Sequence, residues 1–147
     1  ITSKGASATL AAALAPTAAT GTHCATHAVD KTSKAVLSTT SKGQTLIGQT
    51  VITGRVAVKG RYGQLDARVW DRDPKTGLQR LIDRGAYRLK DNEKGSFRFT
   101  LDGNGWRFPK GHRIVVELLG RDAPTYGASP ATFRATLTNV KVALPVR

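Results

Sequence analysis

Hydrophobic and polar side chains alternate along several short runs after residue 43. In one run, Phe97, Phe99 and Leu101 are separated by polar residues. A period of two places successive side chains on opposite faces of a β-strand, so that one row faces a core. Glycine, proline, asparagine and aspartate separate the runs, as turns require. The pattern predicts strands near Thr45–Val58, Gln64–Arg72, Leu78–Leu89, Gly95–Leu101, Arg113–Gly120 and Thr132–Leu144.

The second of these runs shows most clearly what such a strand would bury and expose. Its apolar row is expected to face the core and its other row to face outward. The two rows are Leu65, Ala67, Val69 and Asp66, Arg68, Trp70, in that order. Basic residues occupy similar outward positions in the other runs, so positive charge is expected on the outer face of the sheets.

Short strands with turns between them predict an all-β fold. Asp73–Gly77 has the composition of a tight hairpin turn, because proline fixes φ and glycine accepts a positive φ. Asp122–Pro130 is expected to be a longer loop at one end. No repeat of fixed period is present. We therefore expect two antiparallel sheets in a jelly-roll sandwich over residues 43–147.

Residues 1–42 differ in composition from the rest of the chain. Ala, Thr, Ser and Gly dominate this segment, and it contains no aromatic residue. Such a segment has little bulky apolar surface to bury, so we expect an irregular linker or a segment that packs against something else. Within it, Ala and Leu predict a short helix over Ala8–Ala15 that ends at Pro16.

The chain is strongly basic, with 23 Lys and Arg against 10 Asp and Glu and a formal charge of +13. Such a field attracts nucleic acid, anionic lipid or an acidic partner. The basic residues are spread singly along the predicted strands, which is typical of a solvated strand face. We therefore do not expect specific nucleic-acid binding.

No apolar run approaches the roughly 18 residues that a membrane span requires. The short apolar stretch Leu10–Leu14, preceded by Lys4, weakly resembles part of a signal peptide, and from it we expect an extracellular or secreted protein. Because the chain starts at Ile1 rather than Met, we expect a processed product or a fragment.

Cys24 is the single cysteine, so no disulfide can form within the chain. His23 and His27 flank it, but a metal site usually needs three or four ligands, and no other Cys or His lies near in sequence. We expect a cysteine that packs or bridges to another domain rather than a metal site or a nucleophile.

Two aspartates beside the predicted hairpin turn are weak calcium candidates. Asp71 and Asp73 faintly resemble a calcium loop, but the further acidic ligand of a strong motif is missing. The alternative is that they accept backbone hydrogen bonds and pair with Arg72 or Arg84. His112 is expected to be a strand-edge histidine with a hydrogen-bond partner. Apart from the calcium candidates, we expect no cofactor.

Two tryptophans and the long loop supply the candidate binding residues. An indole face stacks on sugars or apolar groups. Trp70, in an outward row, is expected to be exposed or covered by another domain, which makes it the first interface candidate. Trp106 is expected to close one end of the sandwich as a core residue. Arg121, Asp122 and Tyr126 either line a cleft or pin the loop by an ion pair.

Five segments, in this order, resemble one known family. They read LDARVWDRDP, LIDRGAYRL, GWRFPKGHRIVVEL, GRDAPTY and TNVKVALP, all within residues 43–147. They are similar to the C-terminal jelly-roll, galactose-binding-like domain of X-Pro dipeptidyl-peptidases and of the related cocaine esterase and glutaryl-acylase-type hydrolases. Each segment alone is modestly specific, but five in the family's order argue against coincidence.

The resemblance implies a role without catalysis. In that family the jelly-roll follows an α/β-hydrolase domain that carries the catalytic Ser, Asp and His, packs on it, and helps to wall the substrate cleft. This chain has no G-x-S-x-G nucleophile elbow, so none of those catalytic residues transfers to it. We expect a non-catalytic accessory domain with the hydrolase domain as its partner. The alternatives are a free-standing binding module for carbohydrate or an anionic polymer and, with less support, a small esterase.

Overall fold

The computed structural model describes residues 8–11, 26–27, 35–122, 125–127 and 129–147, and every regular element in them is a β-strand. The strands are β1 (Ala8–Ala11), β2 (Thr26–His27), β3 (Ala35–Thr40), β4 (Thr45–Gly48), β5 (Val51–Gly60), β6 (Gln64–Arg72), β7 (Gln79–Arg88), β8 (Lys94–Thr100), β9 (Asn104–Arg107), β10 (Arg113–Leu119) and β11 (Phe133–Ala143). No helix in this part of the chain is long and apolar enough to cross a membrane.

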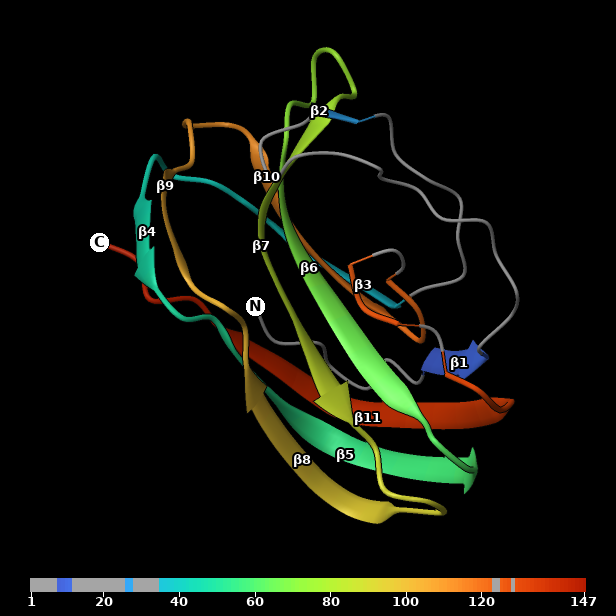
Figure 1. The fold of residues 1–147 in the computed structure, drawn as a ribbon. Coiled ribbons are helices and arrows are strands. Elements are labelled where there is room, and N and C mark those ends of the chain that lie inside the picture. Colours follow the sequence, from blue (N-terminus) through green and yellow to red (C-terminus); the bar gives the residue numbers. More distant parts are fainter. Residues whose placement is uncertain (1–7, 12–25, 28–34, 123–124, 128) are drawn as a thin grey trace.

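Most of the strands form two antiparallel sheets, which pack as a sandwich (Figure 1). The four-stranded sheet has the order β1-β11-β5-β8, and the five-stranded sheet has the order β2-β7-β6-β10-β3; β4 and β9 pair separately. The expected all-β fold with two antiparallel sheets is confirmed. The finer expectation of a galactose-binding-like variant stays a prediction.

The core lies between the two sheets and contains the predicted apolar rows. The rows of β6, β8 and β11 are buried in one cluster, namely Leu65, Ala67, Val69, Phe97, Phe99, Phe133, Ala135 and Leu137. Burying one large apolar side chain contributes about 1.5–3 kcal/mol, so these rows hold the sheets together. Beside them, Leu46 of β4 is fully buried, and Trp106 of β9 is half-buried and packs against the cluster, so the core position predicted for Trp106 is met only in part.

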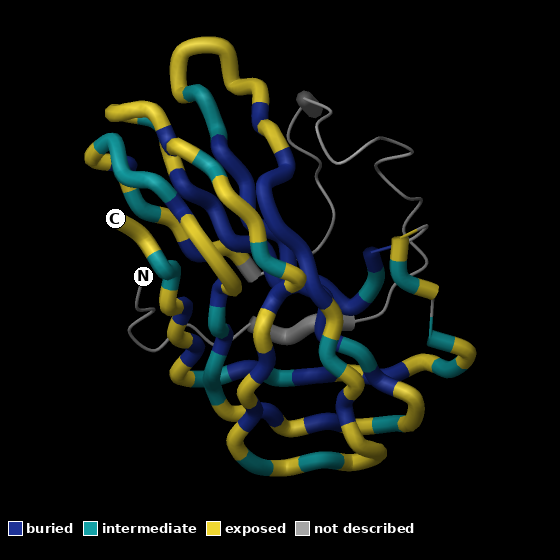
Figure 2. Tube along the Cα trace, turned by 60° about the vertical axis from the view of Figure 1, so that its left-hand side comes forward, coloured by how far each residue is buried: buried dark blue, intermediate teal, exposed yellow. Residues whose placement is uncertain are grey.

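The outer faces of the two sheets differ. Along β11 and along most of β5, buried and less buried residues alternate, whereas β6 is buried at every position from Leu65 to Asp71. Figure 2 shows the central strands of the five-stranded sheet as continuous dark blue and the four-stranded sheet in alternating colours. The expectation that the row of Asp66, Arg68 and Trp70 is exposed is therefore wrong, because the central strands of the five-stranded sheet are buried on both faces.

Segments before residue 42 add strands to both sheets. β1 pairs with β11, β2 with β7, and β3 with β10. The predicted helix is wrong for Ala8–Ala11, since ladder hydrogen bonds to β11 override the helix propensity of alanine; residues 12–15 lie outside the described part. β3 extends the five-stranded sheet upstream of the boundary expected at residue 43.

The hairpin turn predicted at Asp73–Gly77 is confirmed. The backbone N–H of Gly77 donates to the carbonyl of Asp73 at 2.9 Å, and φ of Gly77 is 73°. The turn joins β6 to β7, and a register shift beside Trp70 lets one extra residue of β7 enter the ladder. As a result, Ile82 of β7 joins the core cluster.

Candidate functional site

Four charged side chains meet in a buried cluster on the outer face of the five-stranded sheet. Arg68 of β6 lies directly opposite Arg84 of β7 and Glu117 of β10. Asp122, from the loop after β10, is 1% exposed and bridges the two arginines. Its Oδ1 accepts hydrogen bonds from Nε of Arg68, at 2.9 Å, and from Nη2, and its Oδ2 lies 3.6 Å from Nε of Arg84. Glu117 Oε2 lies 3.9 Å from Nη1 of Arg68, so two carboxylates balance two facing arginines.

The same bridge fixes the loop after β10. The backbone N–H of Tyr126 donates to the carbonyl of Asp122 at 3.0 Å, and the Tyr126 hydroxyl donates to Oδ2 of Asp102 at 3.2 Å. Burial, together with the Asp102 carboxylate, raises the pKa of Tyr126 to about 12, so the phenol remains a donor at neutral pH. Nε of Arg121 is buried with no hydrogen-bond partner among the described residues. For Asp122 and Tyr126 this geometry matches the alternative in which they pin the loop.

Trp70 is enclosed within this chain and is only 2% exposed. Its indole clusters with Leu81 and Val115, and its Nε1–H donates to Oε2 of Glu117 at 2.7 Å. The Arg68 guanidinium lies 5.8 Å from the ring centroid. The prediction of an exposed or partner-covered indole is therefore wrong, because neighbouring side chains of its own sheet surround it.

A pocket of about 520 Å³ lies between the ends of β6 and β7 and residues Ser129 and Pro130, which follow β10 in the loop that contains Asp122. Its lining consists of Tyr62, Gly63, Gln64, Ala86, Tyr87, Arg88, Ser129 and Pro130. Tyr62 is 46% exposed, and the Arg88 guanidinium lies 5.8 Å from its ring centroid. Sequence analysis missed Tyr62 because it lies in a turn between two strands. An aromatic residue in the glycine-flanked turn Gly60–Gly63 was the available signal.

One residue of the pocket lining, Gln64, is hydrogen-bonded to a buried carboxyl. Nε2 of Gln64 donates to Oδ2 of Asp66 at 2.9 Å. Burial raises the pKa of Asp66 to about 6, with a further contribution from the Asp122 carboxylate, while Gln64 and Arg68 oppose the increase. The pocket thus has an aromatic and cationic rim, and its lining residue Gln64 is bonded to a weakly acidic carboxyl.

The other end of β6 holds a second polar group. Asp71 Oδ1 lies 2.8 Å from Nδ1 of His112, and its Oδ2 accepts a hydrogen bond from Nε1 of Trp106 at 3.0 Å. Asp73 Oδ1 accepts from the backbone N–H of Lys75 at 2.8 Å. The partner predicted for His112 and the backbone hydrogen bond predicted for Asp73 are confirmed, but Asp71 pairs with His112 rather than with an arginine.

These contacts leave little support for a metal site. Protein donors already occupy oxygens of Asp71 and Asp73, and the described residues contain no group of three or more His, Cys, Asp or Glu that could hold a metal ion. His23, Cys24 and the side chain of His27 lie outside the described residues, so those predictions remain predictions.

The described residues also lack the geometry of covalent hydrolysis. A hydrolytic triad needs a base that is hydrogen-bonded both to a carboxylate and to a nucleophile. His112 has the carboxylate partner, but no hydroxyl in this part of the chain hydrogen-bonds to its ring. The arrangement can orient a loop and offer a pocket, and it has no nucleophile and base pair.

A comparison with protein families matches residues 3–144 to the X-Pro dipeptidyl-peptidase C-terminal non-catalytic domain. The chain belongs to this family. The X-Pro dipeptidyl-peptidase C-terminal domain is described as non-catalytic. A search of curated proteins found no significant match.

Solved structures of hydrolases contain a fold similar to this X-Pro dipeptidyl-peptidase C-terminal domain. An α-amino acid ester hydrolase matches with a TM-score of 0.63 and 17% identity over 76% of this chain and 25% of its own. An aminopeptidase from a marine sediment Thaumarchaeota archaeon matches with a TM-score of 0.60 and 15% identity, again over 76% of this chain and 25% of its own. A CocE/NonD family hydrolase from Staphylococcus aureus matches with a TM-score of 0.63 and 12% identity, over 97% of this chain and 37% of its own. The chain therefore spans a quarter to about two fifths of these proteins.

Proposed function

We propose that this domain packs on an α/β-hydrolase catalytic domain of the same parent protein and shapes its substrate cleft. The observation that carries the proposal is the family match over residues 3–144 to a non-catalytic C-terminal domain. The small share of each hydrolase that the chain covers supports the same view. The parent would supply the nucleophile, and this domain would supply side chains that line the substrate cleft and position the substrate.

The docking site that we favour is the end of the sandwich that holds the pinned loop. Tyr62 and Arg88 form an aromatic and cationic rim there, and the exposed Pro130 of the loop lines the same pocket. Tyrosine and arginine are enriched among the residues that dominate binding energy at interfaces. Contacts within the chain already hold Asp122 and Tyr126 of the loop, so docking need not order these two side chains.

Isothermal titration of this chain with the separately expressed hydrolase domain of its parent tests the proposal. We expect association, and we expect the double variant Tyr62→Ala, Arg88→Ala to weaken it by at least about tenfold. Arg98→Ala, which removes an exposed cation from β8 on the other sheet, is the matched control and should change the affinity by less than about twofold.

Turnover of a p-nitrophenyl ester completes the test. The chain alone should hydrolyse nothing. Failure to associate with the hydrolase domain, or ester turnover by the chain that disappears on a single Ser or His substitution, would contradict the proposal.

Carbohydrate binding receives less support from the structure. Trp70 is buried, and the half-buried Trp106 has the Arg80 guanidinium 5.2 Å from its ring centroid. Trp70 therefore offers no open face for a sugar, and a guanidinium competes for the ring of Trp106.

A further inference from the structure

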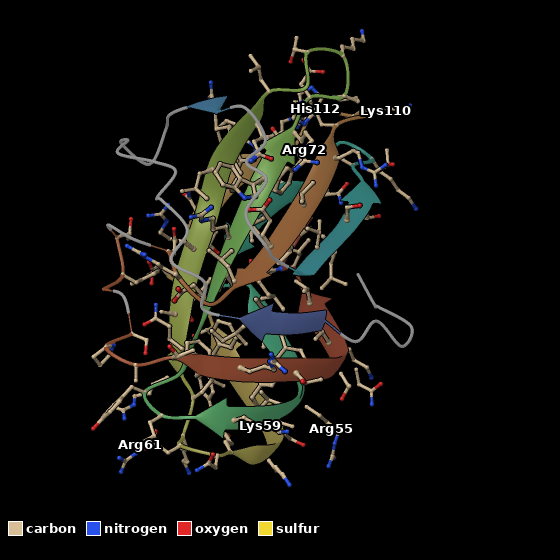
Figure 3. All side chains as sticks on the ribbon, turned by 90° about the vertical axis from the view of Figure 1, so that its right-hand side faces the viewer. Arg55, Lys59, Arg61, Arg72, Lys110 and His112 are labelled. Atoms are coloured by element: carbon tan, nitrogen blue, oxygen red, sulfur yellow. The ribbon has the colours of Figure 1, made fainter. Side chains whose placement is uncertain are left out.

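Six cations project from the outer face of the four-stranded sheet, and together they form what we call the cationic face. All are exposed residues at outward positions of β5, β8 and β11, namely Arg55, Lys59, Lys94, Arg98, Arg134 and Lys141. Figure 3 shows Arg55 and Lys59 on β5, at the opposite end of the molecule from Lys110 and His112. The other sheet has no comparable open face in the described residues, because its central strands are buried on both sides.

No acidic side chain of the described residues lies on the cationic face. Asp66, Asp71, Asp83, Glu117 and Asp122 are buried in or beside the five-stranded sheet. The remaining acidic residues lie in turns and are engaged there: Asp73 with Lys75, Asp91 with Arg61, Glu93 with the backbone of Lys90, and Asp102 with Tyr126. Among the described residues, no ion pair involves a cation of the face. Within the described residues, no acidic side chain on the same face therefore neutralises these six positive charges.

The register brings these cations together at a cost to stability. Lys59 of β5 lies directly opposite Arg134 of β11, and like charges in directly opposed positions destabilise a sheet. Along β5, Arg55 and Lys59 are four residues apart, which is about 13 Å at 3.3 Å per residue. Small side chains such as Ala57 and Thr136 lie between the cations, so the face is broad and has no bulky cover. Since folding gains nothing from this pattern, an external anion is its best physical explanation.

We infer that the cationic face binds a linear polymer that carries repeated phosphate or sulfate groups. Several separated cations on an open surface suit a chain of anionic groups better than one compact anion, and each anionic group neutralised releases a counterion. The exposed large hydrophobic residues of the described part, Val36, Ile47, Tyr62, Leu78 and Val146, all lie off β5, β8 and β11. The face therefore offers nothing to stack on bases or to insert into a lipid bilayer, and recognition rests on charge alone.

Titration of the 147-residue chain with heparin and with inorganic polyphosphate, at several NaCl concentrations, tests the inference. The face variant combines Arg55→Gln, Lys59→Gln, Arg98→Gln and Arg134→Gln. We expect it to weaken binding of both polymers at least about tenfold at physiological salt. The slope of log K against log salt concentration should become shallower by about 3, because each of the four lost cations contributes roughly 0.7–0.9 to the slope.

The matched control removes the same charge from exposed cations elsewhere, as Lys42→Gln, Lys75→Gln, Arg107→Gln and Lys110→Gln. It should leave the affinity within about twofold of the unmodified chain. Thermal unfolding checks that both variants fold, and the face variant should be no less stable, since it relieves the pairing of Lys59 with Arg134.

Three results would overturn the inference. Equal losses in the two variants would show that only net charge matters. Absence of polymer binding by the unmodified chain would remove the premise. Binding to vesicles of phosphatidylcholine and phosphatidylserine without binding to either polymer would show that the face recognises a membrane surface instead.

Discussion

Removal of the Asp122 carboxylate is the sharpest perturbation of the buried charge cluster. Asp122→Ala takes away two hydrogen bonds to Arg68 and the neighbour at 3.6 Å from Arg84. Both arginines are nearly inaccessible, with side chains 5% and 7% exposed. They lie directly opposite each other in the ladder, so the variant leaves two facing cations with one bridging carboxylate fewer.

The expected loss of stability is large on the scale of one domain. Removing one partner of a buried ion pair costs roughly 3–5 kcal/mol, against a typical total stability of about 5–15 kcal/mol. With a urea slope of about 2 kcal/mol per molar, the midpoint should fall by about 2 M. Asp122→Asn keeps an acceptor oxygen without the charge and should lose less than Asp122→Ala. Urea unfolding followed by the fluorescence of Trp70 and Trp106 measures both.

Asp91→Ala is the matched control, because it also deletes the aspartate of an Arg–Asp pair. The pair with Arg61 spans 3.6 Å at the surface, with side chains 72% and 37% exposed. The carboxylate also accepts the backbone N–H of Tyr62 at 2.8 Å. Its removal should cost only about 1 kcal/mol. If Asp122→Ala loses no more than Asp91→Ala, the buried bridge does not stabilise the fold as we reason.

Three further substitutions test separate parts of the structure. Burial raises the pKa of Asp66 from 3.8 in the unfolded chain to about 6, so the folded state binds the Asp66 proton more tightly than the unfolded state does. The stabilisation of the folded domain by this proton is lost as pH rises through 6. Asp66→Asn should therefore stabilise the domain on the order of 1–3 kcal/mol above pH 6 and change little below about pH 4, and a pH-independent difference would contradict this. Gly85→Ala should lower the free energy of unfolding in urea by about 1–3 kcal/mol, because the added Cβ would lie 2.8 Å from the Cα of Leu101. Gly95→Ala is its control: the added Cβ meets nothing within 4 Å, so the free energy of unfolding should change by less than about 0.5 kcal/mol. Trp70→Phe removes the donor to Glu117 and should cost about 1.5–3 kcal/mol without weakening association with a hydrolase domain; weakened association would place Trp70 at the interface after all.

The alternation of the sequence predicted the inner face of the sandwich because that face is decided locally. Each apolar row has a period of two, and a one-residue slip would turn the whole row away from the core. Phe97 and Phe99, and likewise Phe133, Ala135 and Leu137, are therefore buried where the pattern places them. The hairpin at Asp73–Gly77 was predictable for the same reason, since its turn chemistry is local.

The outer face of the five-stranded sheet could not be predicted in this way. A charged residue at an alternate position indicates which side of a strand it occupies, but it does not reveal whether that side is exposed. Arg68 is buried because Asp122, 54 residues further along the chain, neutralises it. The prediction for Trp70 failed for the same reason. In the pocket, Tyr62 escaped notice because residues from a turn, two strands and a distant loop are brought together only by folding.

The central position of β11 in the four-stranded sheet governs the order in which the domain can assemble. This strand lies between β1 and β5 and pairs with both, although it is the last of the described strands along the chain and is therefore synthesised after them. Until it emerges, β1 has no neighbour in its sheet and β5 has one open edge, which is a template for pairing with other chains. Contacts between segments so distant in sequence close slowly, so the nascent domain should depend on chaperones more than a bundle of similar length would. A stop codon before Phe133 would therefore give a divided, aggregation-prone sheet rather than a smaller sandwich.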